Sequence, residues 1–385
     1  MKSKLFLYFF ILIVSIGFSQ RQLSELSTIS LLTAEKGSEL YSAYGHSSIR
    51  IKDPVNDIDV VFNYGTFEVD DNELLFLGKF IRGVLDYTLS TESFEWYLRS
   101  YSAGNRGIVE QVFDITLDEK QAIFERLIKN YETDERYYRY DFFFDNCSSR
   151  IHEILKEVLG EGLVYGEDLN ENSPETFRVL IKPAFDFSPW ADFGVGLIMG
   201  YPTDNIASNK QKMFLPIHMM ERFDMATYND KPFIKAKHHL FTSSPKDIST
   251  PFYTKPIFIF TVLFVIIALI SFINFKKNRH YYSIDYLLFF LTGFIGIFFM
   301  FMWIGTRHSP TFENMNMFWA MPLNIIALFF LKSKKIKNYL IIMLILNVLG
   351  FFILPQVFHI AIIPLSCMMA VRYLKNYHYN FIIEK

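Results

Sequence analysis

Residues 141–162 read DFFFDNCSSRIHEILKEVLGEG, and this stretch predicts a helix with a cysteine in its first turn. Apolar side chains recur at helical spacing, at Ile151, Ile154, Leu155, Val158 and Leu159. Asp145 or Asn146 can cap the start of the helix, and Gly160 can end it. Cys147 then lies one turn before the first of these apolar residues and is directed toward the core. Unpaired N–H groups and the positive dipole end of a helix lower the pKa of a thiol and can stabilise an oxyanion.

The chain has two cysteines in 385 residues, Cys147 and Cys367. Residues 1–19 combine two lysines, an apolar stretch and small residues, which is typical of a signal peptide. An uncleaved anchor would place the next residues on the same side, so residues 20–252 are expected outside the cytoplasm. Exported proteins usually pair their cysteines, and Cys367 lies in an apolar run out of reach, so Cys147 is expected to be a reactive thiol. The net charge of -2 gives no reason to expect a nucleic-acid partner.

The segment SAYGHSSIRIKD, residues 42–53, alternates as a β-strand does, with His46 and Ser48 on one face and two isoleucines on the other. Turn residues follow and predict a hairpin. If its loop comprises residues 53–56, His46 lies opposite Asn63, with the two side chains about 5 Å apart on one face. A slip of one residue would move Asn63 to the other face.

Together these residues suggest nucleophilic catalysis, with Cys147 as the nucleophile, His46 as its base and Asn63 holding the ring in the right tautomer. The side chains expected to contact substrate nearby are Tyr44, Ser148 and Arg150. Arg150 could meet a phosphate, or it could simply be solvated. A buried, inert cysteine beside a surface histidine is the alternative, but the helix cap, the strand and the exported location favour catalysis. The histidines show no metal-ligand spacing, and no metal or cofactor is expected.

From residue 253 the chain becomes strongly apolar and predicts a helical membrane domain, residues 253–385, with five spans. The expected spans are about 256–275, 284–304, 318–331, 338–354 and 357–371. The cationic stretches KKNRH, KSKKIK and RYLK separate or follow them, and such stretches favour the cytoplasm. This pattern places the C-terminus in the cytoplasm and the preceding domain outside, as expected of a multi-pass membrane protein.

The loop after the second expected span carries polar residues at the outward membrane edge, among them His308, Asn314 and Asn316. Polar groups near bilayer depth are costly and therefore suggest a substrate site. An ordinary interfacial loop, with Trp303 and Trp319 as belt residues, is an equal alternative.

The segments YGHSSIRI, FNYGTF and FFFDNCSSR, in this order, resemble circularly permuted papain-like enzymes of the NlpC and lecithin-retinol-acyltransferase group. The whole chain more closely resembles the Lnb-type lipoprotein N-acylation transferases, through RGIVEQVFDIT, LIMGYPTD, FLPIHM and TRHSPTFENMNMFWAMPL as well. In the last segment Met321 departs from the family pattern. This resemblance implies an α+β permuted papain-like exported domain followed by an α-helical five-span transmembrane domain. It matches the family's cysteine and histidine motifs at Cys147 and His46.

The resemblance also implies a location, in a bacterial inner membrane with the N-terminal domain in the periplasm, and a reaction. Cys147 would take an acyl chain from a membrane phospholipid as a thioester and pass it to the α-amine of a diacylated lipoprotein. A membrane-tethered cysteine peptidase or amidase acting on cell-wall peptides could use the same residues, although five spans and a polar outward loop exceed what a tether needs. A non-catalytic membrane scaffold is the third hypothesis, and it predicts that Cys147 tolerates replacement.

Overall fold

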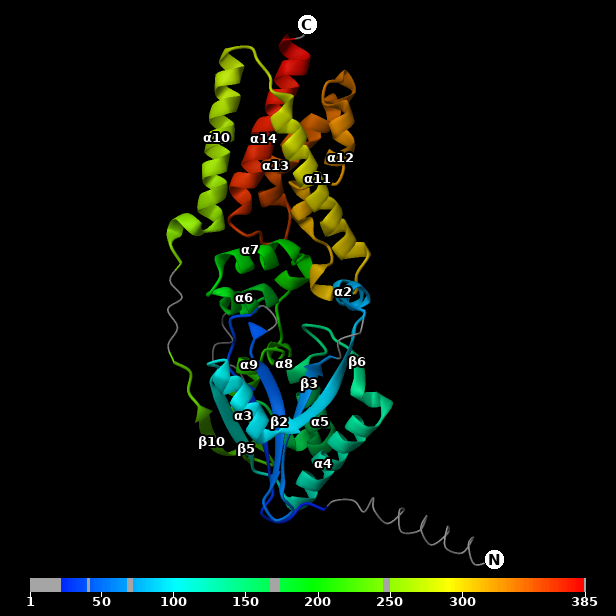
Figure 1. The fold of residues 1–385 in the computed structure, drawn as a ribbon, viewed down its shortest axis with the longest axis vertical. Coiled ribbons are helices and arrows are strands. Elements are labelled where there is room, and N and C mark those ends of the chain that lie inside the picture. The colour runs from blue at the N-terminus through cyan, green and yellow to red at the C-terminus, as the bar shows by residue number, and fades with distance from the viewer. Residues whose placement is uncertain (1–21, 40–41, 68–71, 167–173, 245–249, 384–385) are drawn as a thin grey trace, which may run out of the picture.

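A computed structural model of the protein describes residues 22–39, 42–67, 72–166, 174–244 and 250–383. The expected signal peptide, residues 1–19, lies outside the described residues. Figure 1 shows a sheet-containing N-terminal domain below an elongated helical bundle that carries the C-terminus at its far end.

The N-terminal domain is built on a seven-stranded sheet whose paired strands are all antiparallel. Across the sheet the strands are β10 (Ile234–Phe241), β5 (Ile108–Phe113), β1 (Thr28–Ala34), β2 (His46–Asp53), β3 (Ile58–Thr66), β4 (Asp86–Ser93) and β6 (Tyr137–Arg139). A second, three-stranded sheet consists of β7 (Leu163–Val164), β8 (Thr227–Tyr228) and β9 (Lys231–Pro232). Strand β10 pairs with β5 and forms one edge of the large sheet.

The hairpin between β2 and β3 forms as expected, but in a register shifted by two residues. Asp53 pairs with Ile58, so the loop comprises residues 54–57 and not residues 53–56. A shift of two keeps every side chain on its expected face, because strand side chains alternate with a period of two. Asn63 therefore stays on the face of His46 even though it is no longer directly opposite.

Helices cover both faces of the large sheet. One face packs against α4 (Leu117–Glu132), α5 (Cys147–Leu159) and α9 (Pro216–Asp224) in a shared apolar core. The other face packs against α3 (Phe94–Ala103), whose Tyr97 is buried with Val61 and Leu32. The helix expected after Cys147 is confirmed. The permuted papain-like relationship stays a prediction.

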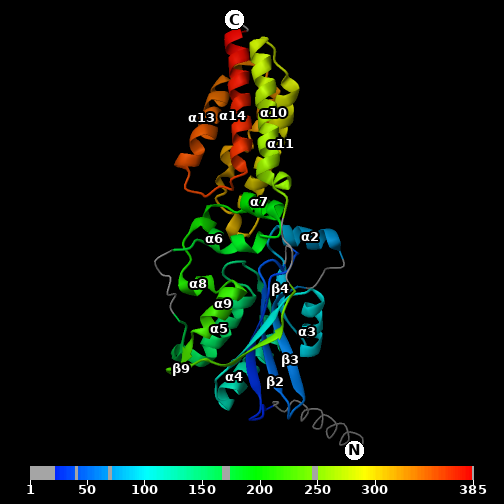
Figure 2. The same ribbon diagram turned by 90° about the vertical axis from the view of Figure 1, so that its left-hand side faces the viewer.

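A layer of short helices separates the sheet from the bundle (Figures 1 and 2). It contains α6 (Phe177–Ile181), α7 (Pro189–Ile198) and the turn Tyr201–Asp204, while α8 (Asn209–Lys212) lies beside α5. Helix α2 (Glu73–Ile81) lies at the same level, beside the lower end of the bundle. Asp204, in the turn of this layer, pairs with Arg178 of α6 at 2.7 Å and accepts a hydrogen bond from the backbone of Val357.

The bundle contains α10 (Pro256–Lys276), α11 (Tyr282–Ile304), α12 (Asn324–Ala327), α13 (Lys337–Ile353) and α14 (Ile362–His378). Three helical segments of the described chain are long and apolar enough to cross a membrane, namely Pro256–Lys276, Tyr282–Ile304 and Lys334–Ile353. The last expected span is displaced along the chain, because α14 begins at Ile362 and ends at His378. The count of five crossings stays a prediction.

The expected span 318–331 is not a continuous helix, which corrects that prediction. It contains the four residues of α12 and short 3₁₀ turns. Its backbone packs closely on α11, where a Cβ atom added to Gly296 would lie 2.0 Å from the Ala320 carbonyl oxygen. The buried Asn324 amide bonds to Thr292 at 2.8 Å and to the Tyr373 hydroxyl at 3.1 Å. Irregular backbone is tolerated at membrane depth when protein surrounds it in this way.

The cationic stretches gather at the end of the bundle remote from the sheet. Asn380, after α14, bonds to Tyr282 at the start of α11 at 2.6 Å and to the Leu331 carbonyl at 2.8 Å. These contacts bring KKNRH, KSKKIK and the C-terminal segment to the same end of the molecule (Figure 1). The sidedness inferred from charge is compatible with this arrangement, and the cytoplasmic position of the C-terminus stays a prediction.

Candidate active site

The first turn of α5 is held in place by its cap. The side chain of Asn146 accepts hydrogen bonds from the backbone N–H groups of Ser148 and Ser149, at 2.9 and 3.0 Å. Its amide group donates to the carbonyls of Phe142 and Phe214, at 2.8 and 2.9 Å. Asn146 is thus saturated and buried, and it fixes the position of Cys147, the residue that follows it.

The thiol of Cys147 is buried and is not part of a disulfide. Burial is the largest influence on it and by itself would raise its pKa. The charge and ring hydrogen bond of His46, the backbone N–H of Ser47 and the side chain of Ser148 act in the opposite direction. These effects together exceed that of burial and lower the pKa of the thiol from its ordinary value, which favours the nucleophilic thiolate.

His46 begins β2 and is oriented by a chain of polar groups. Asn63 donates from its amide nitrogen to a Glu92 oxygen at 2.8 Å, which turns its carbonyl oxygen toward the histidine. That oxygen lies 3.2 Å from His46 Nε2 and also accepts from the Ser48 hydroxyl at 2.7 Å. Because this oxygen can only accept, Nε2 carries the proton. Nδ1 is then the unprotonated nitrogen, which is the tautomer that a base toward the thiol requires.

Glu92 was not anticipated from the sequence. It lies on β4, and its approach to Asn63 depends on the pairing of β4 with β3, which has an irregularity after Asn63. Burial is the largest influence on Glu92 and raises its pKa, partly offset by the hydrogen bond from Asn63 and the charge of His46. No local pattern in the segment DYTLSTES marks this glutamate.

Gly65 lies beside the side chain of Cys147. Its φ of +86° is a conformation that glycine adopts easily. A Cβ atom added there would lie 3.7 Å from the Cβ of Cys147 and 3.6 Å from the ring of Tyr140. The FNYG sequence therefore supplies both the orienting amide, at Asn63, and a strand position without a side chain, at Gly65.

Three tyrosines surround the thiol and were not singled out from the sequence. The ring of Tyr101 is stacked on that of His46, with 6.4 Å between centroids and 10° between planes. Burial raises the pKa of Tyr101 to about 12, against an opposing influence of Arg106. Burial also raises the pKa of Tyr138 and of Tyr140, and the charge of the Cys147 thiolate adds to the effect at both. An aromatic surrounding of this kind excludes water and suits an apolar substrate.

The residues expected to contact substrate are largely engaged with other side chains. Tyr44 packs on Phe142 with 4.5 Å between ring centroids. Ser148 is buried, and its hydroxyl lies 2.9 Å from that of Ser47. Arg150 forms a bidentate pair with Asp145 and lies over the Tyr138 ring, so its charge is already neutralised. A phosphate contact for Arg150 has no support in this arrangement.

The outward loop between α11 and α12 reaches the sheet domain. Ser309 donates to Asp141 at 2.6 Å, and Asp141 also accepts from the backbone N–H of Phe143 in the turn before Cys147. The outward loop is therefore hydrogen-bonded directly to the turn that precedes Cys147.

The polar residues of this loop have structural partners. Asn314 and Asn316 are fully buried, and their amide groups donate to the Leu197 carbonyl at the end of α7, at 2.7 and 3.1 Å. His308 Nε2 lies 3.1 Å from the carbonyl of Phe80 and 3.0 Å from that of Ile81, in α2. In this arrangement the two asparagines and the histidine position the loop, and their contact with a substrate stays a prediction.

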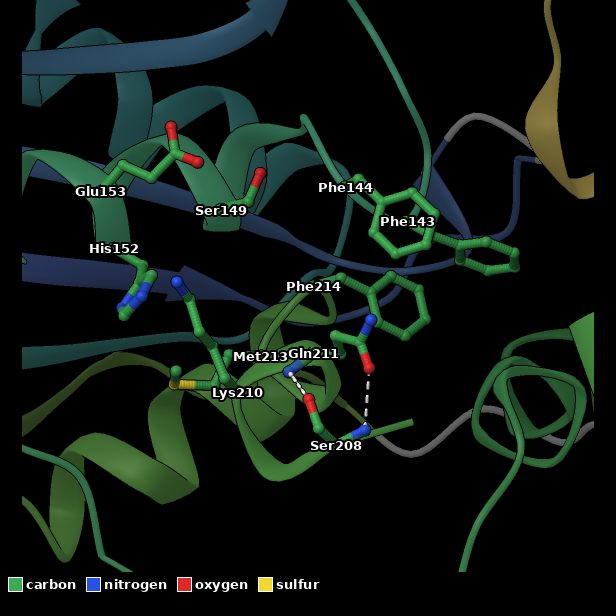
Figure 3. A pocket seen from close by; sticks show the side chains of 10 residues that line it. All are labelled: Phe143, Phe144, Ser149, His152, Glu153, Ser208, Lys210, Gln211, Met213 and Phe214. Atoms are coloured by element: carbon green, nitrogen blue, oxygen red, sulfur yellow. Dashed lines mark hydrogen bonds between the residues drawn. The ribbon is translucent and has the colours of Figure 1, made fainter. Parts of the chain in front are cut away.

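A pocket of about 420 Å³ lies beside the first turns of α5, on a face that does not include Cys147. Its lining residues are Phe143, Phe144, Ser149, His152, Glu153, Ser208, Lys210, Gln211, Met213 and Phe214. Figure 3 shows the side chain of Lys210 extending toward His152. Burial, followed by the charges of Lys210 and Lys156, lowers the pKa of His152 to about 4, so this histidine is neutral at pH 7. Within the described ranges of the chain, no group of three or more potential ligands could hold a metal ion.

Comparison with known proteins agrees with this two-part architecture. Residues 18–182 match the model of the Lnb N-terminal periplasmic domain, and residues 247–382 match that of the Lnb transmembrane domain. No curated protein and no solved structure is similar enough to this chain to count as a match. Both domains are present in the order of the Lnb-type N-acyltransferase architecture, and the chain belongs to the Lnb family.

Proposed function

We propose that the chain is a lipoprotein N-acyltransferase that uses Cys147 as its nucleophile and His46 as its base. The observation that carries the proposal is a thiol with a lowered pKa, beside an oriented imidazole, in a turn bonded to the membrane loop through Ser309 and Asp141. This position suits substrates that are anchored in the outward leaflet.

In the first half of the proposed reaction, His46 Nδ1 takes the thiol proton and the Cys147 sulfur attacks an ester carbonyl of a membrane phospholipid. The carbonyl π electrons move to oxygen, giving an oxyanion close to the start of α5, where N–H donors of Ser47 and Cys147 can stabilise it. The intermediate collapses with cleavage of the ester C–O bond. His46 returns the proton to the leaving alkoxide, and a lysophospholipid departs from the thioester.

In the second half, the neutral α-amine of a diacylglyceryl-cysteine lipoprotein attacks the thioester carbonyl. His46 takes a proton from the nitrogen, the C–S bond breaks, and the thiolate recovers that proton. The products are an amide-linked triacylated lipoprotein and the original thiol. Two easier steps thus replace one difficult acyl transfer.

Mass spectrometry of a lipoprotein's N-terminal peptide tests the proposal, in cells that lack their own N-acyltransferase and express this chain. The native chain is expected to add one acyl group to the α-amine, Cys147→Ala is expected to add none, and the matched control Cys367→Ser is expected to behave as the native chain. Free amines in all samples would refute transfer to lipoproteins and make cell-wall peptides the next substrate to test. Acylation by Cys147→Ala would refute the thiol as nucleophile.

A further inference from the structure

Helix α2 presents an apolar surface that no described part of the chain covers. None of its nine residues is buried. Its large apolar side chains are exposed to the following extents: Leu74 82%, Leu75 50%, Leu77 49%, Phe80 46% and Ile81 39%. A helix of this length is marginal in water, and its stability usually comes from burying an apolar face. A contiguous exposed apolar surface of this kind marks an interaction site.

The end of α2 is bonded to the outward end of a membrane helix. The backbone N–H of Arg307 donates to the Arg82 carbonyl at 2.9 Å, and His308 Nε2 reaches two carbonyls in the last turn of α2. The ring of His308 also packs on Gly83, where an added Cβ atom would lie 3.1 Å from it. Both residues closely follow Ile304, the last residue of α11. Helix α2 is therefore held at the level at which α11 leaves the membrane (Figures 1 and 2).

The exposed surface of α2 continues the apolar surface of the bundle. Near the outward end of α11, Phe301 and Ile304 are 40% and 75% exposed. These residues belong to a helix long and apolar enough to span a membrane, so lipid is their expected surrounding. A lipid surface is consequently the partner whose chemistry fits the adjoining face of α2.

A row of aromatic side chains connects α2 with the thiol. It runs through Phe80, Phe76, Phe67, Tyr87 and Tyr140, with successive centroid separations of 6.5, 5.6, 5.5 and 4.5 Å. The Tyr140 ring then lies 3.6 Å from the position of a Cβ atom on Gly65, the residue that faces Cys147. The row thus leads from the membrane level to the reacting sulfur.

We infer that α2 is an interfacial helix, inserted among the acyl chains of the outward leaflet, and that its aromatic row guides a phospholipid acyl chain to Cys147. The insertion of α2 does not depend on the proposed acyl transfer, whereas the guiding role rests on it. The occupant is the acyl-chain region of a phospholipid, because the apolar surface adjoins the expected lipid-facing surface of α11.

Insertion is tested by placing a bimane fluorophore on Leu77→Cys in the full chain, with Cys147→Ala and Cys367→Ser removing the native thiols. The protein is reconstituted in phosphatidylcholine vesicles with or without brominated acyl chains. Bimane at position 77 is expected to lose about half of its emission to the bromines, as an apolar face buried in the acyl boundary should. The matched control is Val55→Cys, which lies 63% exposed in the hairpin at the opposite end of the sheet and is expected to lose almost none. Equal quenching by the bromines at positions 77 and 55 would refute insertion. A bimane at position 77 that is shielded from water but not quenched by the bromines would show that a protein partner covers this face instead.

The guiding role is tested with Leu77→Glu and two acyl donors. A charge on this face opposes insertion, so acylation of Cys147 from long-chain phosphatidylcholine vesicles is expected to slow about tenfold. Reaction of Cys147 with water-soluble p-nitrophenyl acetate is expected to be retained, and Val55→Glu is expected to retain both rates. An unchanged vesicle rate in Leu77→Glu would refute the guiding role alone. A native chain whose Cys147 reacts with neither donor would refute the proposed function.

Discussion

Replacing Asn63 by alanine tests whether the imidazole must be oriented for the thiol to work. In the native chain Asn63 links the Glu92 carboxylate to His46 Nε2, with contacts of 2.8 and 3.2 Å. Alanine removes both contacts. The His46 ring is then free to rotate and to place its proton on Nδ1, the nitrogen that must accept from Cys147.

The size of the effect follows from the bond that is lost. When His46 holds the proton of the thiol it is an imidazolium, so its bond to Asn63 becomes a hydrogen bond from a charged donor. Such bonds contribute about 1.5–3 kcal/mol, which corresponds to a rate decrease of about 10- to 150-fold for Asn63→Ala. Ser48→Ala is the matched control, because its buried hydroxyl donates to the same Asn63 oxygen at 2.7 Å without holding the ring. We expect a loss of at most about threefold for Ser48→Ala, since a neutral hydrogen bond contributes less.

The assay is the initial rate of N-acylation of a diacylated lipopeptide by the purified full chain in phospholipid vesicles, read by mass spectrometry. The pH dependence of alkylation of Cys147 by iodoacetamide is recorded in parallel, since a purely structural defect would not shift its midpoint. We expect the midpoint to rise in Asn63→Ala, because a misplaced imidazole no longer favours the thiolate. An unchanged rate and midpoint in a folded Asn63→Ala protein would refute the orientation argument. Equal losses in Asn63→Ala and Ser48→Ala would show that the effect comes from the fold.

Three further outcomes are expected. In His46→Gln the imidazole no longer offsets the effect of burial, so the pKa of Cys147 should rise and its alkylation by iodoacetamide at pH 7 should slow. An unchanged pH midpoint of alkylation would contradict the role of His46 in lowering this pKa. The pKa of Asp53 is about 2, below its usual 3.8, because burial is outweighed by hydrogen bonds from Ser24, Asn56 and Val55. The Asp53 carboxylate therefore contributes about 2 kcal/mol to the free energy of unfolding above pH 4, and this contribution is lost as the pH falls from about 4 to about 2. Thermal melts of Asp53→Asn should show no such loss of stability between these pH values. Ser309→Ala should slow N-acylation from vesicles about three- to tenfold through loss of the bond to Asp141, while the alkylation rate of Cys147 should stay as in the native chain.

The contacts between the two domains have a consequence for how the site is presented. The loop after α11 is bonded to the turn before Cys147, to the end of α7 and to the end of α2. The thiol, the layer of short helices and α2 are therefore parts of one packed arrangement.

Local patterns predicted several features of the fold well. Apolar spacing and a cap at Asp145 or Asn146 predicted a helix with Cys147 in its first turn, and the structure caps that helix with Asn146. Alternation placed His46 and Asn63 on one face of the sheet. This prediction is confirmed although the predicted hairpin register was wrong by two residues. Apolar length also predicted α10, α11 and α13 closely. The broken segment around Asn324 was not predicted, because its partners Thr292 and Tyr373 lie on other helices.

The sequence by itself thus determined which residues could form the reactive pair, the membrane character of the C-terminal domain and the face on which each strand residue lies. These properties depend on periodicity and on local capping, which a few neighbouring residues decide. Only the tertiary structure decided that Glu92 supports Asn63, that Gly65 faces the thiol and that α2 meets the end of α11. Strand pairing and helix packing bring these residues together over long separations, and their geometry is set by the combined packing of the whole domain.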